Sequence, residues 1–354
     1  MSRHEIAVIA GDGIGTEVVP AAIDCLEAVG SIHDIQFEWR SHDWGSDYFR
    51  AHGRMMPVDG LEILSTSEAI FLGAVGAPDI PDAETLWGLL IPIRRAFEQY
   101  VNLRPVRTIP GVPSLLRDSR PFDLMIVREN NEGEYSEIGG RIYRGLPQES
   151  AVQEAIFTRH GITRIARFAG ELAAGRRQMV TSATKSNGII HTMPFWDEVV
   201  ESVLAEEFGQ VARRSELIDA LSASLVIHPW NFDVIVASNL FGDILSDLAG
   251  AVAGSIGVLP SANLNPERAH PSMFEPVHGS APDIAGKGIA NPIGQIWSGA
   301  MMLDHLGHPD AAQHLIRAFE SALSDGVRTR DLGGTASTED VTGAVVRALA
   351  ETAG

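Results

Sequence analysis

Short apolar runs alternate with longer amphipathic segments along most of this chain, and this alternation constrains its fold more than any other feature. Residues 6–9 are uniformly apolar, as in a strand buried on both faces, and residues 16–29 have helical periodicity. The glycine-rich residues 11–15 between them predict a turn, and Gly30 is the expected end of the helix. Repeated strand–helix alternation predicts an α/β fold in which helices flank a sheet.

The rest of the chain follows the same pattern without an internal repeat. Its 354 residues exceed the size at which single cores stop growing, about 250–300 residues, which favours two lobes with a cleft between them. Between residues 139 and 161 the helical periodicity weakens, which predicts a protruding arm or hairpin. Further strands are expected at 35–39, 69–74, 122–127, 179–183 and 234–237, and further helices at 162–176 and 196–208.

Composition excludes several classes of partner. A formal net charge of −19, with no block of Lys or Arg to offset it, argues against nucleic acid. The single cysteine, Cys25, cannot form an internal disulfide, fits a reducing compartment and is expected to pack in the core. The N-terminus has no apolar signal core, and apolar runs such as 69–75 fall short of the roughly 20 residues that span a bilayer. We therefore expect a cytoplasmic protein with no membrane partner.

The turn at residues 11–15 has two possible interpretations. Glycines between a strand and a helix allow a backbone to approach a pyrophosphate at the helix N-terminus. The dinucleotide fingerprint, however, requires a third glycine where Thr16 stands, and Glu38 comes late for the acidic residue that follows it. A plain tight turn is the alternative.

The most closely spaced candidate metal ligands lie directly after the apolar stretch 232–237. Asp243 and Asp247 are four residues apart, so on a helix both carboxylates project from one face and can share a cation. Oxygen ligands of this kind suit Mg²⁺ or Mn²⁺. The alternative is a helix start made favourable by negative charge.

Basic and phenolic residues could complete such a site. Arg94 lies on an amphipathic helix, Arg104 within residues 102–105, and Arg128 at the end of the predicted strand 124–127. Arg binds carboxylates in a forked, bidentate manner. Each would ordinarily be a surface or ion-pairing residue, but a dianionic substrate needs a cationic pocket in so acidic a chain. Tyr135 and Lys185 could move protons there, although a lone Tyr usually packs and a lone Lys is usually solvated.

Five motifs, taken in order, resemble the metal-dependent β-decarboxylating dehydrogenases, the family of isopropylmalate and isocitrate dehydrogenases. The resemblance covers nearly the whole chain. Residues 87–88, 99–107 and 261–268 are most similar to its tartrate/D-malate dehydrogenase branch. The five motifs are Gly11-Asp12-Gly13-Ile14-Gly15, Asn102-Leu103-Arg104-Pro105, Val127-Arg128-Glu129-Asn130, Asn239-Leu240-Phe241-Gly242-Asp243-Ile244-Leu245-Ser246-Asp247 and Glu275-Pro276-Val277-His278-Gly279-Ser280-Ala281-Pro282-Asp283.

The resemblance implies a two-lobed α/β fold that is not a true Rossmann fold, which turns residues 11–15 into a tight turn. The cofactor-binding lobe would comprise residues 1–102 and 256–354. The second lobe, 103–255, would carry the dimer interface and the arm. Active sites would be shared across a homodimer, with Asp243 and Asp247 holding the metal from one subunit and Asp219 and Lys185 reaching in from the other.

The resemblance also implies the chemistry. A metal, Mn²⁺ or Mg²⁺, would hold the 2-hydroxyl and the adjacent carboxylate of a small dicarboxylic acid. Lys185 would be the base for that hydroxyl, Tyr135 the acid that protonates the enolate after CO₂ leaves, and the three arginines would bind carboxylates. Trp87 would fill space that an isopropyl group needs, which favours D-malate, giving pyruvate and CO₂, or tartrate. Ordinary helix packing is the alternative role of this indole. Isopropylmalate is the alternative substrate, and a monovalent cation is a further possible cofactor of this family.

By the same resemblance the cofactor is NAD. The carboxylate of Asp283 would accept hydrogen bonds from the adenosine ribose and repel the 2′-phosphate of NADP. The NADP-linked relatives carry Lys and Tyr at the positions of Asp283 and Ile284. A simple turn cap at Asp283 is the alternative. The cofactor residues implied are His278, Gly279, Ser280, Ala281, Asp283, Ile284 and Asn291.

Departures from the family pattern are small, and other classes of function remain distinguishable. Asn131 stands where Thr is expected, without affecting an assigned role. A non-catalytic binding protein on the same scaffold would be expected to lack a metal carboxylate, Lys185 or Tyr135, and all are present. A Rossmann reductase without a metal would be insensitive to a chelator.

Overall fold

The computed structural model describes residues 2–118 and 120–351, which form two compact units. Among the described residues, unit 1 comprises residues 2–99, 107–118 and 250–351, and unit 2 comprises residues 100–106 and 120–249. The expected lobes differ from these units chiefly in the segment 107–118, which belongs to unit 1. Residues 1, 119 and 352–354, which include the expected outer limits of the cofactor-binding lobe, lie outside the described part.

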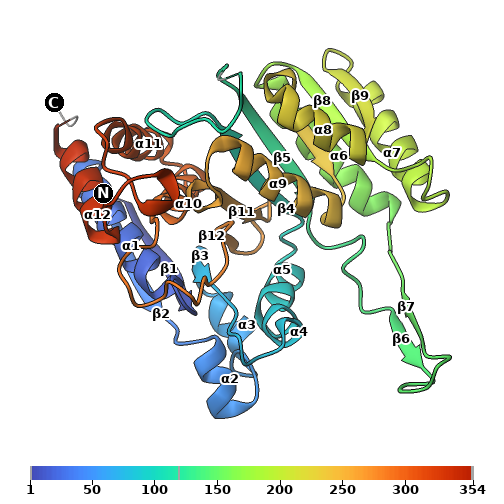
Figure 1. Cartoon of the computed structure of the whole chain (residues 1–354), viewed down its shortest axis with the longest axis horizontal. Coiled ribbons are helices and arrows are strands. Elements are labelled where there is room, and N and C mark those ends of the chain that lie inside the picture. The colour runs from blue at the N-terminus through green and yellow to red at the C-terminus, as the bar shows by residue number, and fades with distance from the viewer. Residues whose placement is uncertain (1, 119, 352–354) are drawn as a thin grey trace. The chain divides into compact units, whose positions relative to one another are not determined.

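Unit 1 contains a mostly parallel sheet with the strand order β2-β1-β3-β12-β11 (Figure 1). Strand β1 pairs in parallel with β2 and β3, β12 is parallel to β3, and β11 is antiparallel to β12. All six residues of β3 are buried, which explains its uniformly apolar sequence. The bounds are β1 Ser2–Gly11, β2 Ile35–Ser41, β3 Ala69–Ala74, β11 Pro260–Leu264 and β12 Ser272–Pro276.

The helices of unit 1 pack on this sheet and on one another. The most deeply buried is α10, in which ten residues have almost no exposure. The buried thiol of Cys25 lies in α1, which confirms the expected core position, and burial raises its pKa. The bounds are α1 Gly15–Ile32, α2 Ser46–His52, α3 Gly60–Leu64, α4 Asp82–Thr85, the π-helix η1 Leu86–Leu90, α5 Ile91–Ala96, η3 Ile256–Val258, α10 Ile293–His305, α11 Pro309–Ser324, η4 Arg330–Leu332 and α12 Thr338–Glu351.

The predicted helix end at Gly30 is wrong, because α1 continues to Ile32. Gly30 is needed there for close packing. A Cβ at this position would lie 2.8 Å from the carbonyl oxygen of Ile35 and 3.0 Å from the ring of Phe37. Gly30 therefore indicates close packing of α1 against β2 rather than the end of the helix.

Unit 2 contains a second run of strands in the order β4-β5-β10-β8-β9 (Figure 1). Strands β5, β10, β8 and β9 pair in parallel, and the four residues of β10 are all buried. The predicted strands and helices are present, with ends that differ by a few residues. The bounds are β4 Val101–Arg107, β5 Asp123–Glu129, α6 Arg159–Ala174, β8 Met179–Thr184, α7 Thr192–Glu207, β9 Ala212–Leu217, α8 Ile218–Ile227, η2 Pro229–Asn231, β10 Val234–Ala237 and α9 Asn239–Ala253.

A separate antiparallel pair, β6 Gly139–Ile142 and β7 Ser150–Gln153, confirms the hairpin predicted within residues 139–161. Every residue of both strands is exposed, and the pair extends away from the other strands of unit 2 (Figure 1). A two-stranded hairpin is at best marginally stable by itself in water. This arm therefore needs further contacts to remain ordered.

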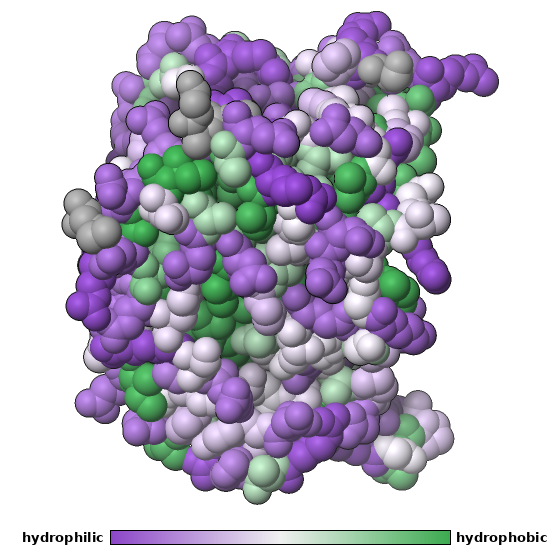
Figure 2. Space-filling model, turned by 90° about the vertical axis from the view of Figure 1, so that its left-hand side faces the viewer, coloured by the Kyte–Doolittle hydropathy of each residue, from purple (hydrophilic) through white to green (hydrophobic). Residues whose placement is uncertain are grey.

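Hydrophilic residues cover most of the face of the molecule seen in Figure 2, and hydrophobic residues on it form a few separate groups. This distribution agrees with a chain that has 46 acidic and 27 basic residues. Among the described residues, no helix has both the length and the apolar character that a membrane span requires. The expected cytoplasmic location stays a prediction.

Candidate active site

Helix α9 begins immediately after the buried strand β10 and carries Asp243 one turn from its start. The side chain of Arg128, at the end of β5, donates to an oxygen of Asp243. Nε and Nη2 of the same guanidinium donate to Oδ1 of Asn239, at 3.2 and 2.7 Å. Arg128 thus links the end of strand β5 to the first turn of helix α9, which follows the neighbouring strand β10.

Arg104 of β4 reaches the same helix. Its Nη1 donates to Oγ of Ser246 at 2.5 Å and lies 3.6 Å from Oδ1 of Asp243 and 3.8 Å from Oδ1 of Asp247. The side chains of Arg104 and Arg128 are 7% and 3% exposed, whereas those of Asp243 and Asp247 are 35% and 59% exposed. The two positive charges are therefore buried, whereas the two carboxylates next to them are accessible.

Tyr135 joins this group through its hydroxyl, which donates to Oδ2 of Asp243 at 2.9 Å. Burial raises the pKa of Tyr135, and the charge and hydrogen bond of Asp243 raise it further, although Arg128 opposes the shift. The phenol therefore keeps its proton at neutral pH and can act as a proton donor. We call Arg104, Arg128, Tyr135, Asp243 and Asp247 the carboxylate cluster.

The carboxylate cluster has donors that fit a hard divalent cation. Asp243 and Asp247 present oxygens from neighbouring turns of one helix face. Burial raises the pKa of Asp247, Arg104 opposes this, and the charge of Asp243 reinforces it, so a cation between the two would relieve their repulsion. Within the described part of this single chain, no three His, Cys, Asp or Glu side chains gather as a metal site. The pair can thus supply part of a ligand set.

The other two predicted residues of unit 2 pair with each other. Nζ of Lys185, just after β8, lies 2.8 Å from Oδ1 of Asp219 in the first turn of α8. The hydrogen bond from Lys185 lowers the pKa of Asp219, and their side chains are 30% and 66% exposed. The predicted base and third metal ligand thus form an accessible pair of their own.

Arg94 and Trp87 belong to unit 1. Nη2 of Arg94, in α5, donates to Oε1 of Glu275 at 2.7 Å, and the same oxygen accepts from Nδ2 of Asn263 at 2.7 Å. Arg94 is 8% exposed, so Glu275 balances a nearly buried charge. Trp87 lies in the π-helix η1, and the guanidinium carbon of Arg95 is 4.9 Å from its ring centroid.

The predicted cofactor residues lie in the segment 278–291, which we call the 278–291 loop. Nδ1 of His278 is 3.0 Å from the carbonyl oxygen of Gly279, and its Nε2 is buried without a hydrogen-bond partner among the described residues. Burial lowers the pKa of His278, so its ring is neutral at pH 7. A buried nitrogen without a partner fits a site that a polar ligand completes.

Carboxylates from distant segments brace this loop. Both oxygens of Glu17 in α1 accept backbone N–H groups, those of Gly286 at 2.5 Å and Gly288 at 2.9 Å. Oδ2 of Asp331 accepts from Nδ2 of Asn291 at 2.9 Å. Asp283 itself is exposed, as a ribose-binding carboxylate must be.

The turn at residues 11–15 packs against this loop and does not form a phosphate cradle. The amide of Ile14 donates to the carbonyl of Ser280 at 2.8 Å, and a Cβ on Gly13 would lie 2.0 Å from that oxygen. Asp12, Gly15 and Thr16 also direct their amides to protein carbonyls. Because these N–H groups are already used, the tight-turn interpretation is favoured over a pyrophosphate loop.

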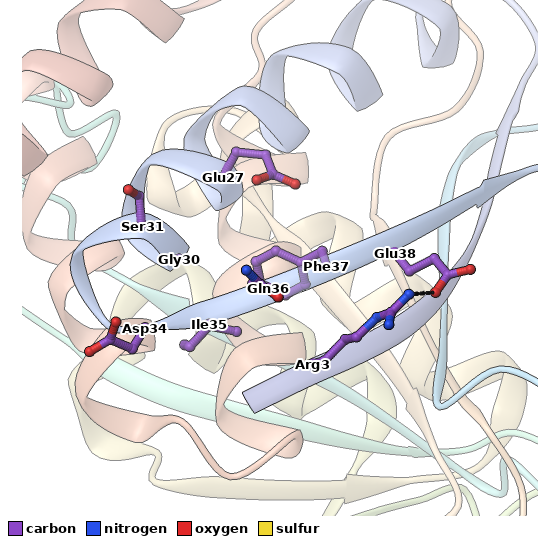
Figure 3. A pocket seen from close by; sticks show the side chains of 9 residues that line it. All are labelled: Arg3, Glu27, Gly30, Ser31, Asp34, Ile35, Gln36, Phe37 and Glu38. Carbon is purple, nitrogen blue, oxygen red and sulfur yellow. Dashed lines mark hydrogen bonds and ion pairs between the residues drawn. The ribbon is translucent and has the colours of Figure 1, made fainter. Parts of the chain in front are cut away.

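None of the predicted site residues lines a cavity of about 520 Å³ in unit 1 (Figure 3). Its lining includes Glu27, Asp34 and Glu38 against one basic side chain, Arg3, which is paired with Glu38 at 2.5 Å. Oε1 of Glu27 accepts from the indole of Trp39 at 2.6 Å. The net negative lining disfavours a dicarboxylate there.

Comparisons with known proteins show the family to which this chain belongs. A model of the isocitrate/isopropylmalate dehydrogenase family matches residues 5–345. The chain belongs to the isocitrate/isopropylmalate dehydrogenase family. It is 53% identical over 344 residues to a probable tartrate dehydrogenase/decarboxylase of Bacillus subtilis (strain 168), covering 97% of each chain. It is 51% identical over 359 residues to the D-malate dehydrogenase [decarboxylating] of Escherichia coli (strain K12), covering 99% of each.

The solved structures confirm the fold class of this isocitrate/isopropylmalate dehydrogenase family member. The isocitrate dehydrogenase from Methylococcus capsulatus superimposes with a TM-score of 0.88 at 35% identity, covering 98% of this chain and 99% of that one. The predicted membership of an enzyme family is confirmed by the same matches. The roles of single residues stay predictions.

Sequence reasoning missed several residues that organise the site of this family member. Their partners lie far away in the sequence, as Glu275 does from Arg94 and Asp331 from Asn291. No spacing rule connects such pairs. Asn239 and Ser246 stand in the motif at residues 239–247 and Glu275 in the motif at residues 275–283, but no role was predicted for them. The missed residues are Glu17, Glu134, Asn239, Ser246, Asn263, Glu275 and Asp331.

Proposed function

We propose that this protein catalyses the metal-dependent, NAD-linked oxidative decarboxylation of a small (R)-2-hydroxy dicarboxylic acid, D-malate to pyruvate and CO₂, with activity on tartrate as well. The observation that carries the proposal is the carboxylate cluster, in which buried arginines, a protonated tyrosine and two accessible carboxylates meet. Relatives above 50% identity named for tartrate and D-malate support it.

The side chains have complementary roles in this proposal. A divalent cation, Mn²⁺ or Mg²⁺, would be held by Asp243 and Asp247 and would polarise the substrate hydroxyl and the carbonyl formed from it. Arg104 and Arg128 bind substrate carboxylates, and Arg94 is proposed to do the same. Lys185 would remove the hydroxyl proton, and a bound NAD would supply the acceptor for the hydride. After CO₂ leaves, the Tyr135 hydroxyl gives its proton to the substrate carbon.

The proposed cofactor is NAD, bound along the 278–291 loop. The exposed carboxylate of Asp283 suits the two hydroxyls of an unphosphorylated ribose and repels a 2′-phosphate. The buried Nε2 of His278 and the amide of Asn291 face the adenosine in this proposal. Gly279, Ser280, Ala281 and Ile284 complete its surroundings.

The proposed assembly is a homodimer with shared active sites. Asp219 and Lys185 would act at the carboxylate cluster of the other subunit, completing the ligand set that one chain lacks in its described part. Apolar side chains on the surface of unit 2 support such an interface. The exposed residues are Ile138, Ile142, Tyr143, Leu146, Val152, Ile156, Ile189, Ile190, Val226, Ile227 and Ile244.

A substrate panel tests the function directly. D-malate, tartrate and 3-isopropylmalate would be assayed with NAD for both NADH and CO₂, after EDTA treatment and after Mn²⁺ is restored. We expect turnover to disappear with EDTA, return with Mn²⁺ and have the highest kcat/KM for D-malate. Turnover that is indifferent to EDTA, or a higher kcat/KM for isopropylmalate, would refute the proposal as stated. Tartrate is scored by NADH, because its oxidation product need not lose CO₂ at once.

A further inference from the structure

The loop at residues 132–135 attaches to a different neighbour at nearly every residue. Glu132 accepts from the backbone N–H and hydroxyl of Thr158, at 2.8 and 2.5 Å. Gly133 exchanges backbone hydrogen bonds with Ile156, at 2.7 and 3.0 Å. Glu134 turns the other way, toward the start of α9, and Tyr135 follows it. The loop is therefore fixed between helix α6 and helix α9.

Glu134 caps helix α9 from outside the helix. One carboxylate oxygen accepts the backbone N–H of Leu240 at 3.1 Å, and the other accepts the hydroxyl of Ser238 at 2.7 Å. The first turn of α9 has no acidic residue of its own. Because helix starts have N–H groups without intrahelical acceptors and a partial positive charge, a carboxylate there stabilises both.

The next residue makes a second attachment one turn further along the same helix. The Tyr135 hydroxyl donates to Asp243 at 2.9 Å. Glu134 and Tyr135 are adjacent, so the two contacts join the loop and the helix at two points. A single hydrogen bond would let the phenol swing away, whereas two consecutive attachments fix where it can reach.

We propose that Glu134 is a positioning residue that holds the Tyr135 hydroxyl at the carboxylates of α9. This inference rests on the proposed function, in which Tyr135 donates the proton and Asp243 and Asp247 hold the metal. Glu134 itself touches no reacting atom in this proposal. It acts through the loop and the first turn of the helix.

Glu132 provides a matched control within the same loop. It is a half-buried glutamate two residues away, and it accepts a backbone N–H and a hydroxyl at the start of a helix, as Glu134 does. Its helix, α6, carries no proposed site residue. If these contacts matter only for stability, Glu132 and Glu134 should behave alike.

The experiment compares Glu134→Ala, Glu134→Gln and Glu132→Ala in the full chain. It measures kcat and KM for D-malate, the Mn²⁺ dissociation constant from paramagnetic resonance of the free ion, and the thermal midpoint. For Glu134→Ala we expect kcat to fall about tenfold, KM to stay within about twofold, and the Mn²⁺ dissociation constant to rise about threefold. Glu134→Gln keeps one acceptor oxygen and should recover part of kcat.

Glu132→Ala should lower the thermal midpoint while kcat and Mn²⁺ binding stay within about twofold of the unaltered protein. The inference is overturned if Glu134→Ala keeps normal kcat and Mn²⁺ affinity, or if Glu132→Ala loses as much of both. If the unaltered protein shows no Mn²⁺-dependent turnover of any acid in the panel, the proposed function fails, and the inference fails with it.

Discussion

The carboxylate cluster of unit 2 and the 278–291 loop of unit 1 are built by different means. In the cluster, ionised side chains contact one another directly, as Arg128 contacts Asp243. In the loop, backbone groups are held by carboxylates of other segments, as Glu17 holds Gly286 and Gly288. In the proposed function, a side chain in the cluster therefore acts in the chemistry itself, whereas one on the loop adjusts which ligand binds.

The largest effect is expected for Asp243→Asn in the cluster. The change keeps the size of the side chain but removes a charge that Arg128, Tyr135 and the proposed cation all use. We expect kcat/KM for D-malate to fall at least about 100-fold and Mn²⁺ affinity to fall with it, as measured by kinetics and metal titration. Asp304→Asn, an exposed acid of unit 1, is the control. Normal Mn²⁺ binding and turnover in Asp243→Asn would remove the assignment.

The loop should respond with a change of preference instead of a loss of chemistry. Replacing Asp283 by Lys together with Ile284 by Tyr puts a positive charge where a 2′-phosphate would lie. We expect kcat/KM to fall about tenfold with NAD and to rise about tenfold with NADP. Asp325→Lys in the same unit adds an equal charge elsewhere and should leave the preference unchanged. If the unaltered enzyme already uses NADP as well as NAD, the role of Asp283 is wrong.

Trp87 sharpens the comparison, because it belongs to unit 1 yet is proposed to act on the substrate. Trp87→Ala opens space next to Arg95, and an added alkyl group in an apolar pocket contributes about 1–3 kcal/mol. We expect the ratio of kcat/KM for isopropylmalate to that for D-malate to rise about tenfold. Trp230→Ala, which has no proposed substrate role, is the control. An unchanged ratio would show that the indole only packs.

The pH dependence of the free energy of unfolding should also differ between groups in the two units. Burial raises the pKa of Glu129 in unit 2 to about 7, although Arg164 opposes the shift. The folded state therefore binds this proton more tightly than the unfolded chain, so the stabilisation is complete below about pH 4.5 and is lost as the pH rises through 7. In urea titrations we expect the unaltered protein to lose about 1 kcal/mol relative to Glu129→Gln between pH 6 and 7.5. An identical loss in the variant would contradict the assignment.

His305 in unit 1 should have the opposite pH dependence. Burial lowers its pKa to about 4, and Arg268 adds to the shift. The unfolded chain then takes up the proton first, so the stabilisation is complete above about pH 6.5 and is lost as the pH falls toward 4. Between pH 7 and 5.5 we expect the unaltered protein to lose about 1 kcal/mol relative to His305→Gln, whereas His270→Gln, an exposed control, should lose as much as the unaltered protein. The same acid loss in both variants would count against this explanation.

The sequence was sufficient for features that depend on neighbouring residues. Uniformly apolar runs marked β3 and β10, and the four-residue spacing of Asp243 and Asp247 placed both carboxylates on one helix face. Gly30 was misjudged because a glycine needed for close packing has the same local signature as one that ends a helix. Periodicity does not distinguish the two.

The contacts that set the site could not be read from spacing. Glu134 meets Leu240 and Ser238, and Arg94 meets Glu275, only because the fold returns distant segments to one place. The pairing of Lys185 with Asp219 also depends on how β8 and α8 lie together. Motif resemblance identified several of these residues, but the physical partner of each is set by the tertiary fold.

The interleaving of unit 1 along the chain has a consequence for synthesis on the ribosome. Strand β3 pairs with β1 on one side and with β12 on the other. Ala69 of β3 pairs with Ser272 of β12, so about 200 residues separate these two partners. At roughly 5–20 residues per second, one apolar edge of the nascent sheet waits about 10–40 s for its partner. The strands of unit 2 are all translated in that interval. Chains truncated after residue 250 and released from the ribosome should therefore show a protease-resistant unit 2 and an N-terminal segment that still needs chaperone protection.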